Sequence, residues 1–272
     1  MPKQQRKIPF TAGLIALAVV SSSAVADNVT KSIEDALKFG DGGAVKIDLN
    51  TRYENVNQYN VRVPALRGKP LPPSKQPDTA NAVTTRLRLG LLSPVFHGLQ
   101  GYAEYQGVYA MDSDYNSTRN GKTGYSVVAD PYESELDQLW ISYAGIPDTA
   151  IKGGRQVIQF DDQRFIGNVG WRQLQQTFDS ALITNKSIKN LTVNAGYIGR
   201  VKTITTTTEG TTAPILNVNY KLGDYGSITG YGYWLDFTDP GANAVYYKST
   251  QSYGLRLTNF QKPGDSFKLN DN

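Results

Sequence analysis

The chain has 272 residues, no cysteine, a single histidine and a formal net charge of +4. The absence of cysteine excludes a disulfide framework and a thiolate metal site, and one histidine leaves little room for histidine-based catalysis or metal binding. The 17 tyrosines and 26 glycines favour a β-rich protein.

The first 26 residues have the pattern of a secretory signal peptide. Lys3, Arg6 and Lys7 precede an apolar run over residues 10–20, and Ala24-Val25-Ala26 is a small-x-small cleavage signal. We predict cleavage after Ala26. The leader holds three basic and no acidic residues, so its removal lowers the net charge to +1. The basic character of the whole chain is therefore no sign of nucleic-acid binding.

A short helix is predicted at the start of the mature chain, within an N-terminal periplasmic segment over residues 27–43. In residues 28–40, Ile33, Ala36 and Leu37 share one helical face, and Gly40 can end the helix.

A strand with one apolar and one charged face follows. Over residues 45–54, Val45, Ile47 and Leu49 alternate with charged and polar residues such as Lys46 and Asp48. Alternation over roughly ten residues matches the length of one strand of an outer-membrane barrel.

Later segments repeat this alternation, with Leu87, Leu89, Leu216 and Val218 expected toward lipid and Arg86, Arg88 and Asn217 toward the lumen. Short connections, such as residues 93–98, alternate with long ones, such as 55–83, 160–176 and 201–212. The pattern predicts an all-β, antiparallel up-and-down transmembrane β-barrel over residues 44–272, with about eleven strands. The eleventh is expected at 266–270, and because bacterial barrels have even strand numbers, we expect the barrel to be incomplete at its C-terminal end.

One arginine conflicts with simple alternation. Within the strand at 150–157, Arg155 shares a parity with Ile151 and Val157, and an arginine facing mid-bilayer lipid costs about 2–4 kcal/mol. We predict a β-bulge at Gly153-Gly154 that turns Arg155 into the lumen.

The stretch from Gly153 to Asp179 carries the most specific signal. Gly154-Arg155-Gln156, Asp161 or Asp162, Arg164-Phe165-Ile166-Gly167, Trp171 and Phe178-Asp179 together resemble the signature segment of the alginate-export family of outer-membrane β-barrel porins. The resemblance extends over most of residues 44–269. It implies passive passage of a solute through an arginine-lined barrel in the outer membrane of a Gram-negative bacterium, and the namesake proteins pass an anionic polysaccharide.

The interpretation that follows is a channel for small or anionic solutes, including uronate-type sugars. The loop at 160–176 is predicted to fold into the barrel, where Arg155, Arg164 and Arg172 together would set a preference for anions. Two alternatives are that it is a solvated surface loop, or that the arginines pair with lumen acids. The predicted lining residues are Arg52, Arg86, Arg88, Glu104, Arg155, Asp161, Asp162, Arg164, Arg172, Asp179, Arg200 and Arg256.

Two other classes of function are weighed against a channel. An enzyme would need a nucleophile and a base, and Asp161-Asp162 has no partner cluster at a useful spacing, so we predict no catalytic residue, no metal and no cofactor. A soluble periplasmic or extracellular β-rich binding or adhesion protein would need polar outward faces. The expected partners are outer-membrane lipid and the solute, with a homo-oligomer left open and no nucleic acid.

Overall fold

The computed structural model describes residues 36–58, 76–237 and 248–258. The chain divides into two compact units, Met1–Lys38 and Phe39–Asn272, and the second carries the sheet described below. The predicted leader with its cleavage site, most of the predicted helix and the predicted strand at 266–270 lie outside the described residues. Within the described part, residues 38–39 are extended, so the end of the predicted helix is wrong.

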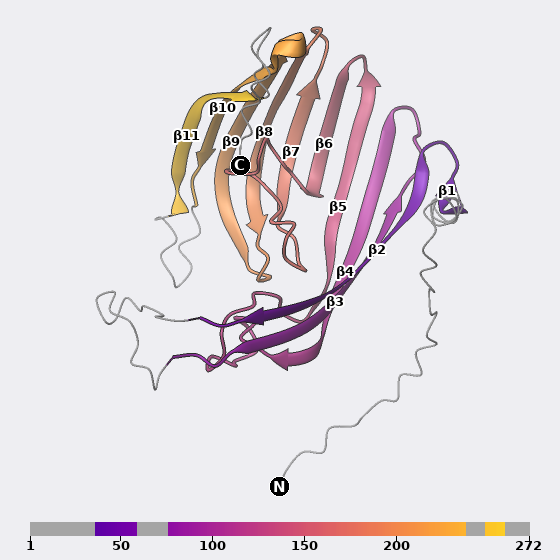
Figure 1. Cartoon of the computed structure of the whole chain (residues 1–272). Helices are drawn as coiled ribbons and strands as arrows, with labels where there is room; N and C mark the ends of the chain where they lie inside the picture. Colours follow the sequence, from indigo (N-terminus) through magenta and orange to yellow (C-terminus); the bar gives the residue numbers. More distant parts are fainter. Residues whose placement is uncertain (1–35, 59–75, 238–247, 259–272) are drawn as a thin grey trace. The chain divides into compact units, whose positions relative to one another are not determined.

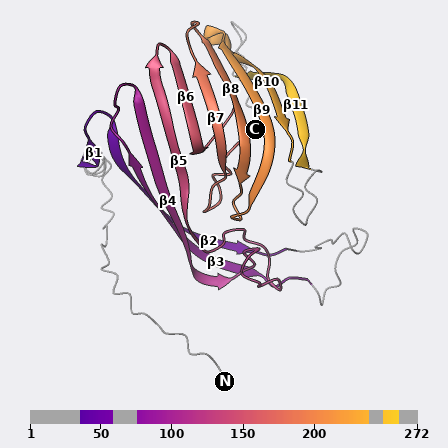
Figure 2. The ribbon, with the colours of Figure 1, turned by 180° about the vertical axis from the view of Figure 1, so that it is seen from behind.

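Eleven strands form one sheet in which the order of the strands is their order in the sequence. Figures 1 and 2 show this from both sides. Every pairing from β2 to β11 is antiparallel, as the up-and-down prediction requires. The strands are β1 (Lys38–Phe39), β2 (Gly43–Val56), β3 (Ala80–Leu92), β4 (Leu99–Asp114), β5 (Glu133–Ile146), β6 (Thr149–Gln156), β7 (Thr177–Asn185), β8 (Leu191–Lys202), β9 (Thr208–Lys221), β10 (Ser227–Leu235) and β11 (Thr250–Thr258).

The number of strands agrees with the prediction for a partly different reason. The sequence count of eleven included residues 266–270, whereas the structure reaches eleven with the two-residue β1. Among the described strands, no pairing joins β11 to β1 or β2, so the sheet is open.

Short and long connections alternate along the sheet. Residues 93–98, 147–148, 186–190 and 222–226 join strands at one end, and residues 57–79, 115–132, 157–176 and 236–249 at the other. The predicted long loop at 201–212 is wrong, because β8 and β9 extend further and leave only residues 203–207 between them. In outer-membrane barrels the long loops are extracellular, which orients the strands.

The two faces of the sheet differ as the alternation predicted. Leu49 and Leu216 lie on the outer face with 69% and 39% of their surface exposed, whereas Arg86 and Asn217 on the inner face are 7% and 4% exposed. Directly paired residues share a face, and Leu49 pairs with Leu87, while Asn50 pairs with Arg86. An apolar outer face suits contact with lipid, where a polar face would be costly.

Connections, not a second sheet, cover the inner face. Ile158 and Ile166, between β6 and β7, pack with Phe178, Ile198 and Tyr233 of the strands. Tyr115 and Val128, between β4 and β5, pack with Ala80 and Ala82 of β3. The buried apolar clusters therefore attach two long connections to the inside of the sheet.

The predicted bulge at Gly153-Gly154 is wrong. The pairing of β5 with β6 runs without a shift from Tyr143–Ile151 to Leu139–Arg155, and the pairing of β6 with β7 is also continuous. Arg155 therefore shares a face with Leu139, which is 54% exposed on the outer side. Gly154 has a φ of 121°, and a Cβ there would collide with the Leu139 carbonyl oxygen, which explains the glycine without a bulge.

Arg155 is instead stabilised on the outer face by a carboxylate. Its Nε donates to Asp179 Oδ1 at 2.7 Å, and its Nη2 donates to Oδ2 at 3.0 Å. Arg200 lies opposite Asp179 on β8, beside a register shift, and is exposed. Arg155 is one residue from the end of β6, close to the long connections. The cost of an outward arginine is lower near the membrane interface than at the midplane.

Candidate pore-lining site

The connection at 157–176, here called the inward loop, crosses the inner face of the sheet. Gln173 Nε2 donates to the carbonyl and hydroxyl oxygens of Thr84 on β3, at 3.0 and 2.9 Å. On the other side, Asn217 Nδ2 of β9 donates to Asp161 Oδ2 at 2.9 Å. The path of the loop from β6 to β7 can be followed in Figure 1. The inward position predicted from the sequence is therefore seen, and the alternative of a solvated surface loop is wrong.

Apolar residues and tight turns within the inward loop fix its path. Ile166 and Leu174 are 2% and 1% exposed. Asp161 and Gln163 have φ values of 52° and 62°, in a region that costs a non-glycine residue about 1–2 kcal/mol. Packing of Ile166 and Leu174 offsets that cost, since full burial of such a side chain contributes about 1.5–3 kcal/mol.

Four arginines meet under one half of the inward loop. We call Arg52, Arg86, Arg88 and Arg172 the arginine cluster. Each has a carboxylate within ion-pair distance: Arg52 contacts Asp130, Arg86 Nη2 donates to both oxygens of Asp48 at 2.8 Å, Arg88 Nη1 is 4.0 Å from Asp48 Oδ2, and Arg172 Nη1 is 3.3 Å from Glu54 Oε1. For these four residues the alternative interpretation, in which the arginines pair with acids of the lumen, describes the geometry.

Asp130 holds this half together, and sequence reasoning missed it. Its side chain is fully buried. Oδ1 accepts the backbone N–H of Gln173 at 2.9 Å, Oδ2 contacts Arg52, and Arg172 Nη1 lies 3.8 Å away. The carbonyl oxygen of Asp130 accepts from Tyr115, and burial followed by the negative charge of Asp130 raises the pKa of that phenol to about 12. No local pattern marks an aspartate in a loop as the link between β2 and a second loop.

Amide side chains of the inward loop and of β5 donate hydrogen bonds to the carboxylates beneath the loop. Gln175 Nε2 donates to Asp137 Oδ2 at 2.5 Å and to Glu104 Oε1 at 3.2 Å, and Gln138 donates to the same Glu104 oxygen at 2.9 Å. Glu104 is 8% exposed. This predicted lining residue is therefore covered by the loop and does not face an open passage.

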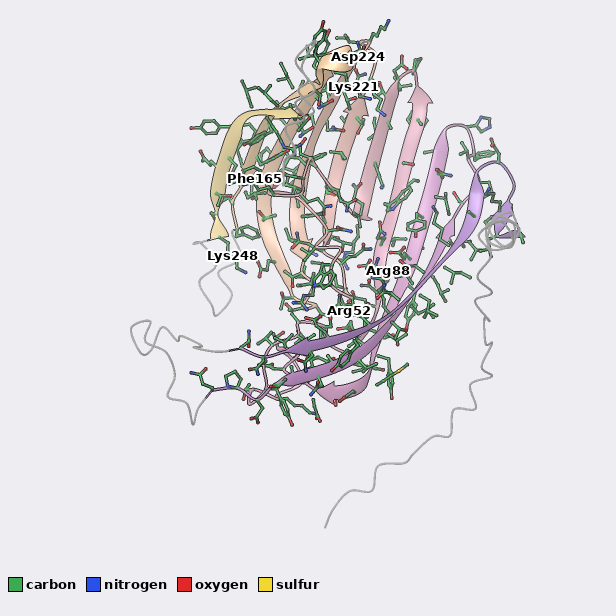
Figure 3. The ribbon with its side chains drawn as sticks, viewed as in Figure 1. Arg52, Arg88, Phe165, Lys221, Asp224 and Lys248 are labelled. Atoms are coloured by element: carbon green, nitrogen blue, oxygen red, sulfur yellow. The ribbon has the colours of Figure 1, made fainter. Side chains whose placement is uncertain are left out.

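The other half of the inward loop borders an open cavity. The aromatic cavity, as we call it, has a volume of about 170 Å³ and lies between the loop and strands β10 and β11, with walls that include Phe160, Asp162, Arg164, Phe165, Tyr231 and Arg256. Figure 3 labels Phe165 beside these strands, well apart from Arg52 and Arg88. Sequence reasoning missed Tyr231 and Tyr233, because alternating tyrosines in a strand give no sign of what they face.

The predicted lining residues thus divide into three groups. Glu104 and the arginine cluster are packed and paired, while Asp161, Asp162, Arg164 and Arg256 surround the aromatic cavity. Arg155, Asp179 and Arg200 form a separate row across β6, β7 and β8 on the outer face.

Within the described ranges, no group of three or more His, Cys, Asp or Glu residues is placed to hold a metal ion. No helix among these residues is long and apolar enough to cross a bilayer.

The open antiparallel sheet, its apolar outer face and the loop across its inner face are features of the porin-type β-barrel fold. Among solved structures, the chain is similar to a BenF-like porin from Pseudomonas fluorescens Pf-5, with a TM-score of 0.53 and 16% identity over 73% of this chain and 52% of that one. Pseudomonas aeruginosa OccK9 (OpdG) gives a TM-score of 0.51 and 16% identity over 72% of this chain and 51% of that one. Acinetobacter baumannii OccAB1 gives a TM-score of 0.50 and 16% identity over 76% of this chain and 50% of that one. The chain spans about half the length of these proteins.

The family model described as alginate export matches residues 75–192, which include the inward loop. This segment is therefore similar to the alginate-export family, as the motif from Gly154 to Asp179 predicted. The fold and the family match both agree with the predicted location in the outer membrane. No curated protein matches the sequence.

Proposed function

We propose that the protein forms a passive channel for small solutes, with the inward loop as its constriction and a preference for anions. One observation carries the proposal: a loop from one side of the sheet contacts inward residues of both β3 and β9, which narrows the space between them. A fixed charge at a narrow point acts on a passing ion more strongly than one at a wide mouth.

Arg164 is the residue that we expect to set the preference for anions. The described residues offer its guanidinium no ion-pair partner, and its Cζ lies 5.7 Å from the centroid of the Phe165 ring. Arg172, by contrast, is close to both Glu54 and Asp130. A paired arginine presents little net charge to a solute, so the sequence-based proposal that Arg155, Arg164 and Arg172 act together narrows to Arg164.

We further propose that the solutes include uronate-type sugars. Guanidinium groups pair with carboxylates in a bidentate manner, and the family resemblance favours acidic sugars. Assembly into a homo-oligomer stays a prediction.

Reversal potentials across a planar bilayer under a salt gradient test the channel and its preference together. Once the barrel is closed, we expect discrete conductance steps, and a lower anion-to-cation permeability ratio in Arg164→Ala than in the wild type. Lys189→Ala is the matched control, because Lys189 is an exposed cation in a short connection at the opposite end of the sheet. No conductance from a closed wild-type barrel would contradict the channel, and an unchanged permeability ratio in Arg164→Ala would contradict the role of this residue.

An apolar outer face argues against the alternative, a soluble binding or adhesion protein. Such a protein would stay monodisperse without detergent, which analytical ultracentrifugation would reveal.

A further inference from the structure

We infer that the outer face of β6, β7 and β8 holds a binding site for the phosphate group of an anionic lipid in the outer leaflet of the membrane, with Arg200 as its principal ligand. The three strands are neighbours in the sheet (Figure 1). The site lies on the face that is turned away from the inward loop. It concerns the lipid around the protein and does not depend on the solute that the proposed channel passes.

An irregularity in β8 turns Arg200 to the outer face. Ile198 is fully buried in the apolar cluster on the inner face, and simple alternation would place Arg200 on the same side. In the pairings of β8 with β7 and with β9, however, Gly199 has no partner, so it is an extra residue. Arg200 consequently pairs with Asp179, which pairs with Arg155 on the outer face. Irregularities of this kind often redirect a side chain at a functional position.

Arg200 is exposed and has no ion-pair partner among the described residues. The carboxylate opposite it is already occupied, because Arg155 donates from Nε and Nη2 to the two oxygens of Asp179, at 2.7 and 3.0 Å. Lys202, two residues further along β8, shows the contrast: it is 8% exposed and contacts Glu135 of β5. Arg200 is therefore available to a ligand from outside the protein.

The level of Arg200 matches that of lipid headgroups. Arg155 and Arg200 lie one and two residues from the ends of β6 and β8, at the end of the sheet with the long, extracellular connections. Trp234 is one residue from the end of β10 and is 39% exposed, and tryptophan is enriched where a membrane meets water. At this level an outward arginine meets polar headgroups, whereas at the midplane it would meet hydrocarbon.

The charges of this row favour a phosphate that belongs to a lipid. Arg155, Asp179 and Arg200 have a net formal charge of +1. Leu139 and Tyr197 of the same face are 54% and 46% exposed, which suits contact with lipid. A guanidinium pairs with phosphate through two parallel hydrogen bonds. A lipid is confined to this surface, so its phosphate has a higher effective concentration there than a phosphate ion in solution.

An open cavity beside the row offers room for the uncharged part of the lipid. It has a volume of about 470 Å³, and its walls include Pro214, Trp234 and Gln251 of β9, β10 and β11. Pro214 pairs with Tyr197, three residues before Arg200 in β8. Directly paired residues share a face, so this wall of the cavity lies on the outer face next to β8.

Native mass spectrometry of the protein in its closed barrel, released from detergent micelles, tests the inference. The probes are dioleoylphosphatidate and dioleoylphosphatidylcholine, which have the same acyl chains, and inorganic phosphate. We expect phosphatidate to bind at least fivefold more tightly than phosphatidylcholine, whose choline group neutralises the phosphate. Arg200→Ala should weaken the binding of phosphatidate about fivefold, the effect of one arginine near an anionic membrane surface.

Asp179→Asn distinguishes a lipid site from a purely structural row. The substitution removes an ion pair, but it frees Arg155 and removes a carboxylate that repels phosphate, so phosphatidate should bind more tightly than to the wild type. Lys189→Ala is the matched control, because it removes an exposed cation at the opposite end of the sheet, and it should leave the binding unchanged.

Equal binding of phosphatidate by the wild type and Arg200→Ala, or weaker binding by Asp179→Asn, would overturn the inference. Displacement of bound phosphatidate by an equal concentration of inorganic phosphate would assign the site to free phosphate and contradict a lipid. Circular dichroism establishes that each variant keeps its β-structure. Arg200→Gln, which keeps a polar side chain without the charge, takes the place of Arg200→Ala if that variant does not fold, and the same loss of affinity is expected.

Discussion

The two halves of the inward loop use arginine in opposite ways. On the side of β2 and β3, Arg52, Arg86, Arg88 and Arg172 are held by Asp48, Glu54 and Asp130. On the side of β10 and β11, Arg164 is unpaired among the described residues, and the contact of Arg256 with Asp162 is loose and exposed. The number of arginines on an inner face is therefore a poor measure of the field that a solute meets. Pairing and exposure decide whether an arginine supports the wall or faces the passage.

Removal of the Asp130 side chain should cause the largest loss of stability, because Asp130 links Arg52 of β2 to the inward loop. Asp130→Ala leaves Arg52 without its buried partner and frees the backbone of Gln173. Breaking a buried pair from one side costs about 3–5 kcal/mol. We expect the free energy of unfolding to fall by that order, measured by urea unfolding in detergent with tryptophan fluorescence, and single-channel current to become noisier. Asp162→Ala, which removes an exposed carboxylate, is the control; equal destabilisation by the two variants would contradict the contrast between the halves.

Loss of a buried apolar side chain from the inward loop should cause the next largest loss of stability. Leu174 is 1% exposed, and Leu174→Ala shortens a fully buried side chain of the inward loop. Large-to-small changes at buried leucines cost about 2–5 kcal/mol. Limited proteolysis should then cut residues 157–176 faster than in the wild type. Val169→Ala, at a position that is 42% exposed, serves for comparison, and an uncut loop in Leu174→Ala would show that polar contacts alone hold it.

The selectivity of the channel should distinguish the two kinds of arginine most directly. One unit charge about 4 Å from an ion is worth about 1 kcal/mol in water, or roughly a fivefold change in permeability ratio. We expect a change of this size in Arg164→Ala and a smaller one in Arg172→Ala, because Arg172 is neutralised by Glu54. The double variant should resemble Arg164→Ala. Reversal potentials measure all three, and a larger effect of Arg172→Ala would invert the comparison.

Removal of the ion pair between Arg155 and Asp179 on the outer face should change the stability least. Asp179→Ala removes the partner of Arg155, and both side chains are about 30% exposed, so the stability should change by no more than about 1 kcal/mol. Urea unfolding of this variant measures the change.

The face of Arg155 has a separate test, which does not depend on the stability of the ion pair. A fluorescent label at Arg155→Cys should be quenched by lipid-soluble quenchers as strongly as one at Leu139→Cys, and more than one at Arg88→Cys. Weak quenching at position 155 would return Arg155 to the lumen.

The faces of the strands could be predicted from the sequence, because alternation along a strand depends only on neighbouring residues. The period of two placed Leu89 and Leu216 on one face and Arg86 and Asn217 on the other, and the structure agrees. The motif from Gly154 to Asp179 predicted the similarity to the alginate-export family, and its mixture of charges and aromatics predicted a loop that folds inward. These features depend on neighbours in the chain or on a short signature.

Only the tertiary structure decided which charges are free. Arg52 and Asp130 are far apart in the sequence, and so are Arg172 and Glu54, so no spacing could predict their pairing. The face of Arg155 depended on the register with Leu139 and Asp179, where an unshifted ladder replaced the predicted bulge. The aromatic cavity needed β10, β11 and the inward loop in one place. Local periodicity fixes the direction of each side chain, but the partner that it meets depends on contacts between distant segments.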